Sequence, residues 1–83
     1  MKGKIFEINQ KRGMVAVLTE SENFSIFEIL TYDNFEIDDE VSWTENHPLG
    51  DCKIKNLTKN EMFIAYFQNH WITKDNLRKQ MLY

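Results

Sequence analysis

The sequence predicts a mainly β domain built on a small closed barrel, and two features of the chain indicate this. Five short stretches are rich in β-branched or alternating apolar residues, and turn-forming residues separate them. A longer polar connection follows the third stretch. The predicted strands are residues 4–9, 14–19, 24–30, 41–44 and 52–58. Short strands in this arrangement are typical of a five-stranded barrel of the OB type.

Length and composition fit one small domain. The chain has 83 residues, of which 42% are hydrophobic, 13% aromatic and 28% charged, and its formal net charge is −3. No apolar run approaches the roughly 18 residues of a membrane helix, so we expect no membrane association. Cys52 is the single cysteine, which excludes an intramolecular disulfide and fits a reducing compartment. We therefore expect a cytoplasmic protein.

The C-terminal segment has a different pattern. Residues 61–71 are dense in aromatic side chains whose spacing fits a strand or a helix, and the alternation favours a strand. A short helix is predicted over residues 74–82, because Thr73 can act as its N-cap and Ile72 can form a hydrophobic staple with Leu77. A helix this short is marginal alone, so it must dock on the rest of the domain.

Several short motifs near the N-terminus keep a fixed order and spacing. Met1-Lys2-Gly3-Lys4-Ile5 opens the chain, and Asn9, Gly13 and Val17 follow. This pattern resembles the opening of the bacterial cold-shock domain, Lys-Gly-x-Val-Lys-Trp-Phe-Asn followed by a Lys-Gly-Phe-Gly-Phe-Ile strand, without a gap. The third strand and the Pro-Leu-Gly turn before Asn56-Leu57-Thr58 resemble later parts of that domain. The resemblance covers residues 1–58 and implies an OB barrel, with residues 59–83 as an extension packed on it in a single structural domain.

The resemblance also implies a ligand, single-stranded RNA or DNA, which that family stacks on aromatic side chains of its first three strands. This chain departs from the family on that same face. Glu7 replaces a tryptophan, Met14 and Ala16 replace two phenylalanines, and Ile26, Glu28 and Ile29 replace an aromatic set. A one-residue slip would return Phe27 to an aromatic position. We therefore expect the barrel to be retained and the stacking face to be largely lost. The negative charges of Glu7 and Glu28 would in addition repel phosphates.

Basic side chains offer another mode of contact with nucleic acid. A rim of lysine and arginine could bind the phosphate backbone, although solvated lysines that prevent edge pairing are the alternative interpretation. The candidate nucleic-acid-binding residues are Lys2, Lys4, Lys11, Arg12, Met14, Phe27, Lys53 and Lys55.

The aromatic C-terminal segment predicts a different kind of surface. Its rings could form a second small core against the barrel, which is the favoured interpretation, or a contact site for a protein partner or a homo-oligomer. The candidate interaction residues are Tyr66, Phe67, His70, Trp71 and Arg78.

Catalytic and metal chemistry find no support in the sequence. His47, Cys52 and His70 do not form the spaced pairs of a structural zinc site, and the acidic residues 38–40 lack the alternation of a calcium loop. We expect no enzymatic activity, no catalytic residues, no metal and no cofactor. Two functional hypotheses remain: weak binding of single-stranded nucleic acid by the basic rim, and an OB barrel repurposed for protein interaction or self-association through the C-terminal extension.

Overall fold

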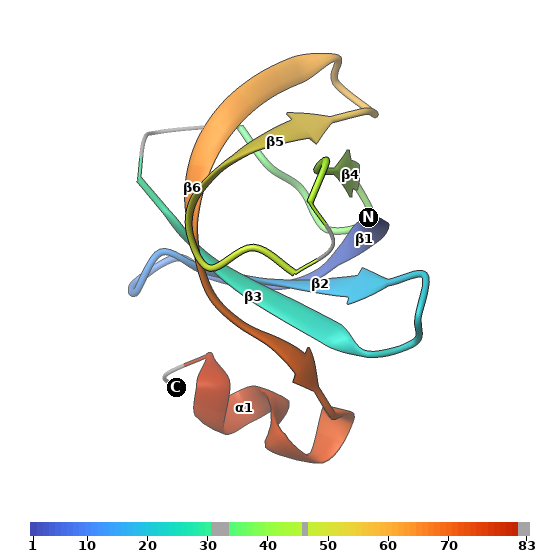
Figure 1. The fold of residues 1–83 in the computed structure, drawn as a ribbon. Coiled ribbons are helices and arrows are strands. Elements are labelled where there is room, and N and C mark those ends of the chain that lie inside the picture. The colour runs from blue at the N-terminus through green and yellow to red at the C-terminus, as the bar shows by residue number, and fades with distance from the viewer. Residues whose placement is uncertain (31–33, 46, 82–83) are drawn as a thin grey trace.

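Six strands close into one barrel within residues 1–30, 34–45 and 47–81, the part of the chain that the computed structural model describes (Figure 1). They are β1 (Lys2–Asn9), β2 (Met14–Thr19), β3 (Phe24–Ile29), β4 (Glu40–Ser42), β5 (Gly50–Asn56) and β6 (Glu61–Ile72). A 3₁₀ turn, η1 (Lys74–Asn76), leads into a short helix, α1 (Leu77–Gln80). No helix of the described ranges is long and apolar enough to cross a bilayer.

The ring order is β1-β2-β3-β6-β5-β4, and β4 closes onto β1. Every neighbouring pair of these described strands is antiparallel. An even number of strands can alternate in direction around a closed ring, whereas an odd number cannot. β3 and β5 run in the same direction, so a direct pairing between them would be parallel. β6 lies between them and pairs with each in the antiparallel direction, which is slightly more stable per residue.

The mainly β class, the barrel, the C-terminal strand and the short helix are as the sequence predicts. The place of the C-terminal strand is different. Residues 61–71 were expected to pack on a five-stranded barrel, but β6 is itself one of the six described strands of the ring. The reason is that β6 offers hydrogen bonds on both of its edges, to β3 on one side and β5 on the other.

Alternate residues of the strands fill the barrel interior. The interior cluster contains Ile5, Val15, Val17, Phe27, Val41, Trp43, Ile54, Phe63, Ala65 and Phe67. Phe27 is completely buried, and its ring contacts those of Phe63 and Phe67 at centroid distances of 5.8 and 5.6 Å. Edge-to-face and tilted ring pairs of this kind stabilise a small core beyond the area they bury.

A second apolar cluster lies outside the barrel, between α1 and the outer faces of β2 and β3 (Figure 1). It contains Met14, Ala16, Phe24, Ile26, Ile72, Leu77 and Met81. Leu77 and Met81 therefore share the buried face of this segment, as their spacing of four residues predicts for a helix. Asn9 of β1 links the residue after α1 to the barrel, because its Nδ2 donates a buried hydrogen bond of 2.8 Å to the Met81 carbonyl.

The start of the helical segment differs from the prediction. The Thr73 side chain does not cap a backbone amide. Thr73 is the N-cap residue of the segment, as predicted, but the capping hydrogen bond is replaced: its hydroxyl oxygen accepts a hydrogen bond of 3.1 Å from the Asn76 side chain. The first turn is a 3₁₀ turn, and the α-helix covers only residues 77–80. The predicted helix end at residue 82, and residues 31–33 of the polar connection after the third strand, lie outside the described residues.

Candidate nucleic-acid interface

The outer face of β2 and β3 carries the positions where the resembled family exposes its aromatic side chains, and here α1 covers that face. Met14 is 4% exposed, and Ala16 and Ile26 are fully buried. Phe27 points into the barrel and is also fully buried. Met14 and Phe27 were predicted as contact residues, but the packing leaves neither side chain available to a base.

Lysines from both halves of the chain meet on another face of the barrel. Lys2 of β1 pairs with Ser42 of β4, and Ser42 pairs with Lys55 of β5. Residues directly opposite each other in a sheet point to the same side, so Lys2 and Lys55 share the outer face, two strand spacings or about 10 Å apart. Lys4 and Lys53 extend this row along their strands in opposite directions. We call these four exposed residues the lysine face; they form a diagonal across three strands.

Exposed apolar side chains flank the lysine face on both sides. On β6, Met62 lies opposite Lys55 and Ile64 lies opposite Lys53. Together with Tyr66 they form a row of side chains on the outer face that are 60%, 46% and 42% exposed. Such a row of partly exposed apolar side chains is a feature of contact surfaces.

On the other flank, Leu18 of β2 lies opposite Lys4. Near it the Phe6 ring makes an edge contact with Phe24 at 5.0 Å and stays 37% exposed. Phe6 is not among the predicted contact residues, although its position two residues after Lys4 on a predicted strand indicates the same face.

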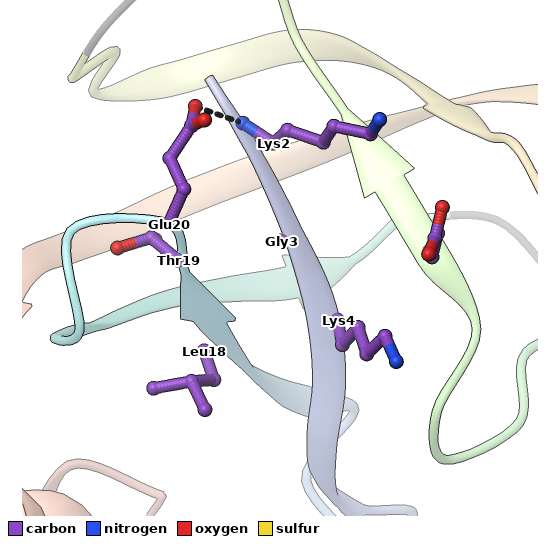
Figure 2. A pocket seen from close by; sticks show the side chains of 7 residues that line it. Lys2, Gly3, Lys4, Leu18, Thr19 and Glu20 are labelled. Carbon is purple, nitrogen blue, oxygen red and sulfur yellow. Dashed lines mark hydrogen bonds between the residues drawn. The ribbon is translucent and has the colours of Figure 1, made fainter.

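A shallow hollow of about 240 Å³ lies between β1 and its neighbours (Figure 2). Its lining residues are Lys2, Gly3, Lys4, Leu18, Thr19, Glu20 and Glu40. Figure 2 shows the Lys2 and Lys4 side chains extending together from β1 to one side, away from Leu18. Two carboxylates reduce the positive charge there: Glu20 accepts a hydrogen bond of 3.2 Å from the Lys2 amide, and Glu40 lies opposite Lys4.

Lys11 and Arg12 do not join the lysine face. They lie in the turn after β1, whose length from Lys2 to Asn9 is about 23 Å at the usual rise per residue. Arg12 instead lines a separate groove of about 450 Å³ beside α1, with Met14, Glu28, Gln68, Lys79 and Gln80. The predicted basic rim is therefore divided between two ends of the barrel.

The predicted interaction residues are also divided, in this case by burial. Phe67 and His70 are buried at 1% and 6% exposure, whereas Tyr66, Trp71 and Arg78 are exposed. Trp71 is 59% exposed and stacks on the His47 ring at 4.0 Å. Phe67 therefore belongs to the barrel interior itself, and the predicted second small core of C-terminal rings against the barrel does not form, because Tyr66 and Trp71 stay exposed.

Both ring nitrogens of the buried His70 contact other groups of the protein. Its Nδ1 lies 2.7 Å from the Ser25 hydroxyl, its Nε2 contacts the Pro48 carbonyl, and its ring stacks on Phe67. A carbonyl oxygen only accepts, so Nε2 carries the proton and Nδ1 accepts from Ser25 in the neutral ring. Burial lowers the pKa of His70; the Pro48 hydrogen bond opposes this and the nearby His47 adds to it. Ser25 is 1% exposed, so this serine–histidine pair cannot meet a substrate.

Metal and thiol chemistry gain no support from the geometry. In residues 1–30, 34–45 and 47–81, no group of three or more His, Cys, Asp or Glu side chains could hold a metal ion. Burial raises the pKa of the Cys52 thiol, and the Glu45 charge acts in the same direction. A thiol that stays protonated is a poor nucleophile.

Comparison of the chain with models of known families, with curated proteins and with solved structures gives no match. The cold-shock resemblance of residues 1–58 therefore stays a prediction.

Proposed function

We propose that this protein is a small, non-catalytic binding module that binds single-stranded RNA or DNA on the lysine face. The observation that supports this most is the convergence of Lys2, Lys4, Lys53 and Lys55, which lie far apart in the sequence, on one side of the barrel. Cations arranged along a diagonal can follow a phosphate backbone without reading its sequence.

The flanking side chains would add contacts with the bases. The Tyr66 and Phe6 rings are partly exposed on either side of the lysines, and stacking of one base on a ring contributes about 1–3 kcal/mol. Glu40 of β4, which lies opposite Lys4, and Asp51 of β5 oppose phosphate binding, as does the net charge of −3. We therefore expect weak affinity with little sequence preference.

Fluorescence anisotropy of labelled single strands tests this proposal. Four phosphate contacts at about −0.7 each give a slope of log K against log salt of about −2.8, which is roughly a 50-fold loss between 50 and 200 mM salt. The double variant Lys53→Glu/Lys55→Glu should bind at least tenfold more weakly. Lys11→Glu/Arg12→Glu is the matched control, because it changes the net charge equally at the other end of the barrel.

Two results would count against the proposal. Absence of saturable binding at high micromolar protein would remove the nucleic-acid function. Equal losses in the two double variants would show that only overall charge matters, and the lysine face would then have no special role.

Protein interaction is a second candidate function, supported by a different observation. Met62, Ile64 and Tyr66 form an exposed apolar row on the outer face of β6, outside the barrel interior and away from the face that α1 covers. Apolar association would depend much less on salt than phosphate binding does. Deleting residues 60–83 would not test it, because β6 is a strand of the barrel; single substitutions on the outer face are needed instead.

A further inference from the structure

The outer face of β5 and β6 has a pattern that is complementary to itself. Three cross-strand pairs lie in sequence along the two strands: Asp51 with Tyr66, Lys53 with Ile64, and Lys55 with Met62. All six residues are exposed. Lys53 and Ile64 form the centre, with an acid and an aromatic ring at one end and a base and a thioether at the other.

We propose that a second copy of this chain docks on this face, related by a two-fold axis that crosses the strands at the Lys53–Ile64 pair. The rotation reverses the strand direction, so each β6 lies over the partner copy's β6. Ile64 then meets the partner copy's Ile64, and Tyr66 meets the partner copy's Met62. Asp51 meets the partner copy's Lys55, and the two-fold axis makes that ion pair twice.

The charges favour a second copy over a different protein. Each copy supplies the acid that the other's base requires, at the same distance from the centre, whereas an unrelated partner would have to reproduce this pattern. The Lys53 side chains meet near the axis, but long lysine side chains can turn their ammonium groups into water. The contact is a packing of two sheet faces, since a closed barrel offers no free edge for strand addition.

This proposal does not depend on nucleic-acid binding, although the two surfaces overlap. Lys53 and Lys55 belong to both, so a bound nucleic acid and the second copy would exclude each other. A saturating single strand should therefore convert dimer into monomer, if the chain binds nucleic acid. The dimer itself is measured on protein free of nucleic acid.

Sedimentation velocity over a wide range of protein concentration tests the dimer. The unmodified chain should show a concentration-dependent shift from monomer to dimer. Asp51→Lys and Lys55→Asp should each weaken dimerisation roughly tenfold or more, since each places like charges together twice. Ile64→Asp should abolish it. Asp75→Lys and Lys74→Asp are matched controls on η1 and should leave it unchanged.

Mixing the two charge variants gives the decisive measurement. In a heterodimer the Asp51→Lys chain presents two lysines to the two aspartates of the Lys55→Asp chain, so both ion pairs return. We expect the equimolar mixture to associate although each variant alone is monomeric. A chain that is monomeric at all concentrations, or a mixture that does not associate, would overturn the proposal. Circular dichroism confirms that each variant is folded.

Discussion

Replacing Gly3 with alanine should destabilise the barrel, although the same change usually stabilises a strand. A Cβ at Gly3 would lie 2.5 Å from the Leu18 carbonyl oxygen and 2.6 Å from Val17 Cγ1. The first of these atoms is backbone, so no rotamer change relieves the contact. Gly3 pairs with Thr19 on one side and Val41 on the other, and both neighbours restrain any shift of β1.

The magnitude follows from the required displacement. Ordinary contact starts at 3.4 Å, so the two strands must separate by about 0.9 Å at this point. Overpacking of this kind costs about 1–3 kcal/mol, which lowers the Tm of a domain of this size by roughly 5–20 °C. Without the clash, Gly3→Ala would instead add about 0.4–1 kcal/mol by restricting the unfolded chain.

Thermal unfolding followed by far-ultraviolet circular dichroism measures this effect. Ser42→Ala, on the neighbouring strand β4, is the control and should change the Tm by no more than about 3 °C. An unchanged or raised Tm for Gly3→Ala would refute the reasoning, because the close approach of β1 to β2 would then not exist in solution.

Three further predictions concern the cover on the barrel and its buried polar groups. Leu77→Ala should lower the free energy of unfolding in urea by about 2–5 kcal/mol, because Leu77 lies on the buried face of α1 and is only 3% exposed. A loss below about 1 kcal/mol would mean that the helix is not docked. The free energy of unfolding should fall as the pH drops from 6.5, the ordinary pKa of histidine, through the lower pKa of His70 in the folded chain, because the His70 ring is protonated first in the unfolded chain. This pH dependence should flatten in His70→Gln. Burial raises the pKa of Asp39, but hydrogen bonds from the Asn56 side chain and the Glu36 amide, together with the Lys59 ammonium 3.1 Å away, lower it further than burial raises it. Lys59→Met should therefore raise the pKa of Asp39 in an NMR titration. An unchanged titration would contradict the ion pair.

The fold and the candidate site differ in how far local sequence predicts them. The alternation of side chains along residues 24–30 predicts Phe24 and Ile26 on one face of the strand and Phe27 on the other, and the structure agrees. The family resemblance pointed instead to Met14 and Phe27 as contact residues. An alignment transfers positions, but it does not report what covers them in this chain.

The sequence by itself determined which segments are strands, that the last segment is a short helix with Leu77 and Met81 on its buried face, and that several lysines lie on exposed positions. These properties depend on residues close together in the chain. Only the tertiary structure decided that β6 enters the ring between β3 and β5, that α1 covers the outer face of β2 and β3, and that Lys2 and Lys55 share a row. The order of the strands depends on which distant edges meet when the barrel closes, and the side-chain pattern of a single strand does not encode that choice.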